Sequence, residues 1–266
     1  MKKNDMLTII GFAIAVVFIF YGMINGGSLK LFVDIPSFAI TVGCSFGAVL
    51  MSYPMKEVKK MIKAGMQILK EDGASKIDSI ELFVTLAKKA RREGLLSLEE
   101  DIQEIDNEFV KRGLNMIVDG IEPEVIREIM TLEINELERR HSDTASMFTT
   151  WGAYAPAMGM VGTLIGLIQM LANLSDASNL ASGMGKALIT TYYGSLLANL
   201  FVLPIAGKLN YKTAEEVNNM EMMIEGVLAI QSGVNPRIIE DKMMVYLAPE
   251  DRVKYISSNN QREAGE

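Results

Sequence analysis

Two apolar stretches of the chain carry hydroxyl groups and prolines whose types and spacing could do chemistry. In residues 151–174 and 187–209, these side chains are Pro156, Thr163, Thr190, Thr191 and Pro204. Hydroxyl and carbonyl oxygens are hard ligands that a small cation accepts in place of water. A proline adds to them, because it frees a carbonyl of the preceding helical turn from its hydrogen bond. The pattern therefore predicts a path for a cation.

The same residues also fit a purely structural role in helix packing. On a helical wheel, one face of the first stretch holds Gly152, Pro156, Gly159, Gly162, Thr163 and Gly166. One face of the second stretch holds Ala187, Thr190, Thr191, Gly194, Ser195 and Ala198. Small residues let membrane helices approach closely, and a threonine can bond a carbonyl of its own helix. The pattern alone leaves both interpretations open.

Four stretches of the chain are long and apolar enough to cross a bilayer, which takes about 20 residues. Besides the two above, these are about residues 7–24 and 35–53. We expect no aspartate or glutamate within any of the four spans. Since a proton carrier needs a titratable group, and a dehydrated Na⁺ is far better held beside an anion, a second polypeptide must supply the carboxylate if ions pass here.

Basic residues near the ends of the spans predict the topology. They are Lys56, Lys59, Lys60 and Lys63 after the second span, Arg139 and Arg140 before the third, and Lys208 and Lys212 at the end of the fourth. Because such residues mark the cytoplasmic side, we expect both termini and the central block in the cytoplasm. Residues 7–24 could also be a signal peptide, but their length and the weak cleavage site after them favour a retained span.

The composition fits a chain divided between membrane spans and a large polar portion. The chain is 49% hydrophobic and 22% charged, with a mean hydropathy of +0.20. A net charge of −7 without a dense basic stripe argues against a nucleic-acid binder. One cysteine and one histidine exclude a disulfide framework and Cys- or His-paired zinc sites. With no nucleophile–base pair and no phosphate-binding glycine loop, we expect neither an enzyme nor a cofactor.

The charged block between the second and third spans is predicted to be helical. Apolar residues recur at helical spacing as far as Ala90, and Gly94 ends that helix. Ser97 and Glu100 have the spacing of a capping box for a helix over about 98–113. Pro123 is expected to begin another helix, which runs through Glu138 and leads toward the third span.

The part after the fourth span is also predicted to be helical. Residues 211–231 form one helix that stops before Gly233, and Asn235 caps a last helix that ends near Leu247. Residues 257–266 are polar and expected to fray. We therefore expect an all-α membrane protein of four parts: transmembrane helices 1 and 2 (1–53), a cytoplasmic helical domain (54–148), transmembrane helices 3 and 4 with the ion pathway (149–209), and cytoplasmic C-terminal helices and tail (210–266). Residues 25–34 and 175–185 form the outer loops.

Several motifs of the chain resemble the MotA/PomA family, the ring subunit of the flagellar stator. The third-span motif is YAPAMGMVGTLIG (154–166), and the fourth is ALITTYYG (187–194), followed by LAN (197–199) and Pro204. The sequence DIPS (34–37) matches the motif that opens the second span. The sequence ARREGLLSLE (90–99) matches the block with the family's rotor-facing charges. Together these motifs cover almost the whole chain in the family's order.

The resemblance implies an assembly and a function. Five copies would surround two copies of a single-span partner, MotB or PomB, which grips peptidoglycan and supplies the missing carboxylate. Ion flow through this complex in the bacterial inner membrane, among membrane lipid, would rotate the ring and push the rotor protein FliG. Arg91 and Glu99 match rotor-contact positions, Lys88, Arg92 and Glu100 match them less closely, and Pro156 and Pro204 match two functionally important prolines. Without the resemblance, such charges would be interpreted as ordinary solvated surface.

The resemblance also bears on the transported ion. Sodium-type members are similar to this chain in having threonine at the positions of Thr163 and Thr190, where proton-type members often have alanine or glycine. Thr191 is shared more widely. The resemblance therefore favours Na⁺, with Thr163 and Thr190 as transient ligands, and leaves H⁺ as the alternative. Competing functions are an energiser of the ExbB/TolQ type, which has three spans in a different order, and a structural scaffold.

Overall fold

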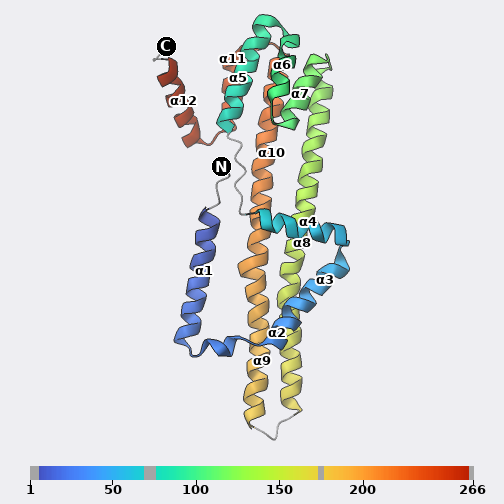
Figure 1. Ribbon diagram of the computed structural model, residues 1–266, viewed down its shortest axis with the longest axis vertical. Coiled ribbons are helices and arrows are strands. Elements are labelled where there is room, and N and C mark those ends of the chain that lie inside the picture. The colour runs from blue at the N-terminus through green and yellow to red at the C-terminus, as the bar shows by residue number, and fades with distance from the viewer. Residues whose placement is uncertain (1–5, 69–75, 173–176, 264–266) are drawn as a thin grey trace. The chain divides into compact units, whose positions relative to one another are not determined.

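The computed structural model describes residues 6–68, 76–172 and 177–263, and every regular element in these ranges is a helix (Figure 1). The predicted all-α fold class is confirmed. The chain divides into two compact units. The membrane unit combines Met1–Asp72 with Arg140–Tyr211, and the polar unit combines Gly73–Arg139 with Lys212–Glu266.

The membrane unit contains the apolar helices. Its elements are α1 (Met6–Asn25), the 3₁₀-helix η1 (Leu29–Phe32), α2 (Ile35–Phe38), the π-helix η2 (Ala39–Gly43), α3 (Cys44–Ser52), α4 (Met55–Gln67), α9 (Ala177–Leu196) and the π-helix η4 (Leu197–Val202). Two long helices, α8 (Pro123–Leu171) and α10 (Leu203–Gln231), contribute residues to both units. A buried cluster around Met61, Phe148 and Val202 joins α3, α4, α8, η4 and α10.

Within the described residues, four helical segments are long and apolar enough to cross a membrane, as the sequence predicts. They are Met6–Asn25, Leu29–Ser52, Pro123–Leu171 and Gly183–Gln231. The predicted outer loop 175–185 is wrong from Ala177 onward, because α9 already begins there. Small polar residues end the hydropathy signal there without ending the helix, since they still allow backbone hydrogen bonding. Residues 173–176, on which the end of the predicted third span and the start of this loop fall, lie outside the described residues.

The polar unit is a bundle around a second apolar core. Its elements, besides the parts of α8 and α10, are α5 (Lys76–Glu93), the 3₁₀-helix η3 (Leu95–Leu98), α6 (Glu99–Glu104), α7 (Glu108–Val118), α11 (Pro236–Met244) and α12 (Pro249–Glu263). Phe83, Leu114 and Met222 are among its fully buried side chains. Pro123 begins α8 as predicted, and the helix continues through Glu138 into the third span.

The predicted helix over 98–113 is wrong, because two helices occupy that stretch. The chain is extended at Ile105, and the Asn107 side chain caps α7 by accepting the N–H groups of Phe109 and Val110 at 3.0 and 3.2 Å. The Ser97 hydroxyl does not form the expected capping box; it donates to the Gly94 carbonyl at 2.7 Å. An asparagine cap competes effectively with helix continuation.

The two predicted glycine ends are confirmed, and the C-terminal prediction needs correction. Gly94 and Gly233 have φ angles of 88° and 65°, which end α5 and α10. Asn235 caps α11 through the Arg237 N–H at 3.0 Å. A further helix, α12, follows, so residues 257–263 are helical where fraying was expected. Pro249 in its first turn favours that helix, and the buried Tyr255 anchors it. The end of the tail lies outside the described residues.

Candidate functional site

The glycine face of α8 packs against α9 at backbone distance. A Cβ atom built on Gly159 would lie 2.9 Å from the Thr190 carbonyl oxygen, and one on Gly166 would lie 3.0 Å from the Ala187 nitrogen. From the other side, a Cβ on Gly194 would lie 2.6 Å from the Ala155 carbonyl oxygen. Because no side chain fits between the helices at these points, the glycines are a packing surface, as one of the two sequence interpretations holds.

The threonines meet at one point of this helix interface. The Thr163 hydroxyl oxygen lies 2.5 Å from that of Thr191 and 3.5 Å from that of Thr190. The carbonyl oxygens of Ala187 and Gly159 lie 2.9 and 3.1 Å from the Thr163 hydroxyl oxygen. The structure thus brings together all three threonines predicted for the ion pathway, in an oxygen-rich cluster between α8 and α9. We call these three residues the threonine cluster.

The threonine cluster has a buried end and an exposed end. Thr190 is only 2% exposed, and its hydroxyl donates to the Ala187 carbonyl at 2.8 Å. Thr191 is exposed, and Ser195 and Asn199, which follow it at four-residue spacing, are exposed as well. Three polar residues therefore line one open face of α9 and η4. In a membrane such a face needs a polar partner or water.

Two contacts that tie the second span to α9 were missed by the sequence analysis. The hydroxyl of Thr41, a fully buried residue of η2, donates to the Thr190 carbonyl at 3.2 Å. The Tyr193 hydroxyl donates to the Phe32 carbonyl at 2.7 Å and accepts the Asp34 N–H at 3.0 Å. A π-helix holds Thr41 in place, and such one-turn irregularities are frequent at functional sites. The hydropathy of the sequence gives no signal for these two contacts.

Asp34 is a carboxylate at the start of the second span. It lies one residue before the predicted span 35–53, within the helical segment Leu29–Ser52. That carboxylate is used locally, because it accepts the Ser37 N–H at 2.9 Å and caps α2. Among the described residues, no group of three or more His, Cys, Asp or Glu side chains could hold a metal ion. The only ligands the threonine cluster offers are hydroxyl and carbonyl oxygens.

The two prolines occupy different backbone settings. Pro156 lies inside α8, which stays helical through it, and its Cα would lie 3.1 Å from a Cβ on Gly194. Pro204 is the second residue of α10, one residue beyond the π-helix η4 and its C-cap Leu203. There the Leu203 N–H donates to the Ala198 carbonyl, five residues earlier. Pro156 therefore belongs to the α8–α9 contact, and Pro204 to a change of helical winding.

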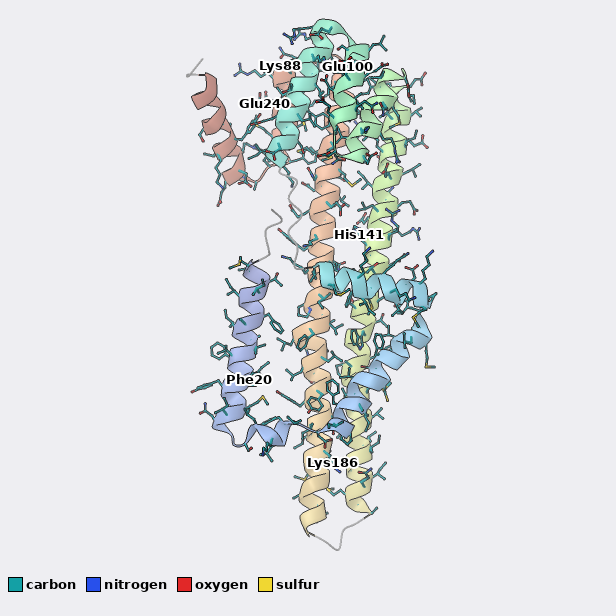
Figure 2. The ribbon with its side chains drawn as sticks, viewed as in Figure 1. Phe20, Lys88, Glu100, His141, Lys186 and Glu240 are labelled. Carbon is teal, nitrogen blue, oxygen red and sulfur yellow. The ribbon has the colours of Figure 1, made fainter. Side chains whose placement is uncertain are left out.

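The five charged residues predicted to face a rotor lie together in the polar unit. All five are exposed: Lys88, Arg91, Arg92, Glu99 and Glu100. Gly94 and the short helix η3 turn the chain between the basic end of α5 and the acidic start of α6. Figure 2 shows Lys88 and Glu100 at the same end of this unit.

An internal ion pair fixes the arrangement of these charges. Lys89 and Asp101 are 2.7 Å apart and join α5 to α6. The hydrogen bond to Asp101 raises the pKa of Lys89 against the opposing effect of desolvation. Arg92 lies 3.8 Å from its neighbour Glu93. One positive and one negative side chain thus pair with each other to join the two helices, and the neighbouring charged side chains remain exposed at the surface.

Leu96 is a further surface residue that the charge pattern did not single out. It lies in η3, between the basic and the acidic group, and its side chain is 69% exposed. An apolar side chain framed by charges is typical of a contact site for another protein. The signal in the sequence was the LLSL segment, of which Leu98 is fully buried and Leu96 is not.

Comparison with known proteins shows which families have a similar sequence. The model of the MotA/TolQ/ExbB proton channel family matches residues 101–222, and the model of the motility protein A N-terminal region matches residues 9–94. Motility protein A of Treponema phagedenis is 43% identical, over 93% of this chain and 96% of its own length. Chemotaxis protein PomA of Vibrio alginolyticus is 37% identical, over 91% of this chain and 95% of its own.

The solved structures agree with the sequence relatives. The flagellar MotAB stator complex from Bacillus subtilis contains a chain that matches with a TM-score of 0.88 and 37% identity. The match covers 93% of this chain and 98% of that one. The MotAB structure from C. jejuni matches with a TM-score of 0.87 and 31% identity, over 92% and 96%.

The apolar helices and the family match define a multi-pass inner-membrane protein of a channel family. More particularly, the chain belongs to the MotA/TolQ/ExbB proton channel family, in its motility protein A branch, and is a flagellar stator subunit. The N-terminal match and the relatives over the whole chain distinguish this branch from ExbB and TolQ, which share only the broader family.

Proposed function

We propose that the chain is the ring subunit of a stator in which ion flow through the membrane unit generates torque on a rotor. The observation that carries the proposal is the threonine cluster, which gathers oxygen ligands but no carboxylate. A single-span partner of the MotB type supplies the acid, and the exposed face of Thr191, Ser195 and Asn199 meets it. The MotAB complexes among the similar structures support such a partner.

The assembly proposed is five copies of this chain around two copies of the partner. Both termini, the block 54–148 and the part 210–266 lie in the cytoplasm, while 1–53 and 149–209 carry the spans. The lysines of α4 and the basic residues within α8 and α10 near the span ends support this orientation, because such residues stay on the cytoplasmic side.

We propose Na⁺ as the transported ion, with H⁺ as the alternative. Na⁺ must exchange its water for other oxygens as it passes, and Thr163 and Thr190 provide two hydroxyls beside the Ala187 carbonyl. A proton would need only the partner's carboxylate and a chain of water. The matching family model is described as a proton channel family, which keeps H⁺ as the alternative.

The ion is identified by motility of a host without its own stator that carries this chain and its partner. Swimming should stop when Na⁺ is replaced by K⁺ at constant membrane potential. Swimming that continues unchanged without Na⁺ assigns the proton instead. Ion flux through the reconstituted complex separates either outcome from a scaffold, which would pass no ion.

The exposed charges of the polar unit are proposed to contact the rotor protein FliG. Arg91 and Glu99 are the main contacts, with Lys88, Arg92 and Glu100 beside them. One elementary charge moving through 100 mV releases about 2.3 kcal/mol, and an exposed ion pair is worth up to about 1 kcal/mol. Contacts of this size can be made and broken within one ion step without stalling the motor.

The rotor contact is tested by charge reversal. Arg91→Glu should lower torque strongly, and a compensating reversal on the rotor should restore part of it. Arg237→Glu, on the exposed start of α11, reverses an arginine of the same unit and should leave torque near wild type. Equal losses for the two variants would contradict a specific role for Arg91.

A further inference from the structure

The helix α4 presents three different faces. Val58 and Met61 are buried and belong to the cluster with Phe148 of α8. A second face carries Met55, Ile62 and Met66, which are 58%, 46% and 69% exposed although all three are apolar. The third face carries the exposed lysines Lys56, Lys59, Lys60 and Lys63.

The three faces have a fixed order around the helix axis. At about 100° per residue, the lysine face lies opposite the buried face, and the exposed apolar strip lies roughly 90° from each. A helix in the plane of a membrane surface needs this order. One side packs on its own protein, the underside reaches the acyl chains, and the far side meets the headgroups.

The position of α4 along the chain puts it at the edge of the bilayer. The membrane-spanning segment Leu29–Ser52 ends three residues before α4 begins. Tyr53 and Pro54 are extended, which redirects the chain. In Figure 1, α4 runs across the direction of α8 rather than along it. A Cβ on Gly65 would lie 3.0 Å from the Phe148 ring, so the contact with α8 is close.

The charge of α4 is opposite to that of the whole protein. Four lysines and one glutamate give the helix a net charge of +3, in a chain of net charge −7. Glu57 pairs with Lys60 at 2.8 Å. Within the described part of the chain, Lys56, Lys59 and Lys63 have no carboxylate partner. Because α4 presents unpaired positive charge beside an exposed apolar strip, a partner that is both anionic and apolar would complement it.

We propose that α4 binds the headgroups of anionic phospholipids, with Met55, Ile62 and Met66 in the acyl region and Lys56, Lys59 and Lys63 on the phosphates. Each lysine near a membrane surface favours anionic lipid by about fivefold at low salt. This site is separate from ion conduction and from the rotor contact. It gives the membrane unit a preferred lipid environment at the base of its second span.

The test uses brominated lipids, whose acyl-chain bromines quench the fluorescence of a nearby tryptophan. The full-length chain with Trp151→Phe and Ile62→Trp has its single tryptophan on the apolar strip of α4. It is reconstituted in vesicles of phosphatidylcholine and phosphatidylglycerol, with either one of the two brominated. We expect both lipids to quench, and phosphatidylglycerol to be preferred several-fold, with the preference falling as salt rises.

Matched variants identify the groups responsible. Lys56→Gln, Lys59→Gln and Lys63→Gln together should bring the preference close to one, whereas the same three positions as arginine should keep it. Lys111→Gln, Lys242→Gln and Lys254→Gln remove equal charge from the polar unit and should leave the preference unchanged. Met66→Trp provides a second reporter if the tryptophan at 62 disturbs folding.

The proposal is overturned by three results. An absence of quenching by either lipid would mean that the strip does not face acyl chains. Equal quenching by the two lipids in the parent protein would mean that the lysines serve something else, such as an acidic protein segment. A preference that survives loss of the three lysines would place its source elsewhere.

Discussion

The hydroxyl oxygens of Thr163 on α8 and Thr191 on α9 lie 2.5 Å apart. Each hydroxyl has one proton to donate, and both Thr163 and Thr190 are within hydrogen-bond distance of the same Ala187 carbonyl. The cluster therefore holds more oxygen acceptors than protons to satisfy them. A cation that enters the cluster would bind these oxygens in place of the hydrogen bonds between them. Ion binding is thereby linked to the contact between the two helices.

Removing the Thr163 hydroxyl should impair ion use more than folding. Thr163→Val keeps the shape but loses the bonds to Thr191 and Ala187, so we expect motility to need more Na⁺, while Thr163→Ser stays closer to wild type. Thr149→Val is the control, because that hydroxyl bonds only the Ala145 carbonyl of its own helix. Motility against Na⁺ concentration measures the effect. A curve for Thr163→Val that matches wild type would exclude this residue as a ligand.

Adding one methyl group at Gly162 should force α8 and α9 apart. Its Cβ would lie 2.5 Å from the Thr190 Cγ2, on a side chain already held by hydrogen bonds. We expect a loss of about 1–3 kcal/mol in the free energy of unfolding, with loss of motility. Gly185→Ala on α9 meets no atom within 4 Å and serves as the control. Thermal unfolding of the two purified variants makes the comparison. Equal melting temperatures would contradict the close contact.

Gly94 should tolerate no side chain, because its backbone is in a glycine-only region. With φ 88° and ψ 164°, Gly94→Asn should cost about 1–3 kcal/mol of stability and should misplace η3. Gly233 has φ 65°, which asparagine accepts more readily, so Gly233→Asn should cost much less. Chemical denaturation of both variants measures the difference. A Gly94→Asn protein as stable as Gly233→Asn would refute the argument.

The Lys89–Asp101 pair should give a stability difference that disappears only at high pH. The hydrogen bond to Asp101 raises the pKa of Lys89 in the folded state. The contribution of the pair is therefore full below the ordinary lysine pKa of about 10.4 and is lost as pH rises through the raised value. Asp101→Asn should lower the melting temperature equally at pH 7 and pH 9, and the two proteins should converge in more alkaline solution. Convergence below pH 9 would point to another group.

Leu96 should contribute to the rotor contact without contributing to folding. Its exposed side chain can be shortened without opening a cavity, so Leu96→Ala should leave the melting temperature unchanged and lower torque. Val253→Ala is the control, since Val253 is 67% exposed on α12 and does not belong to the segment between the charged residues of α5 and α6. Torque is measured on tethered cells. Identical torque for both variants would remove Leu96 from the contact.

The spans and the glycine-ended helices could be predicted because each depends on a local property. Hydropathy located all four spans, and Gly94 and Gly233 ended helices since only their backbones adopt positive φ easily. The boundary at Asn107 could not be predicted, because a side-chain cap there outweighs the helical pattern on both sides. Hydropathy also could not place the start of α9, since a helix can begin outside the bilayer.

The residue types of the site were predicted, but their contacts were not. Helical spacing put Thr190 and Thr191 near one face, and the structure separates them into a buried and an exposed residue. Thr41 escaped notice because its contact to the Thr190 carbonyl joins residues 149 positions apart, through a π-helix that no sequence pattern marks. The charged residues of α5 and α6 were identified by resemblance, while the apolar Leu96 between them was not.

The closeness of α8 and α9 has a mechanical consequence. Where Gly159 meets Thr190 and Gly194 meets Ala155, the two main chains are in direct contact, and no flexible side chain lies between them that could adjust to a sliding movement. A slide of one helix past the other by a single residue, about 1.5 Å, would drive these atoms into each other. The pair therefore moves as one solid part. Any movement within the membrane must instead occur where side chains separate the helices, such as the edge-to-face contact of the Phe12 and Phe201 rings.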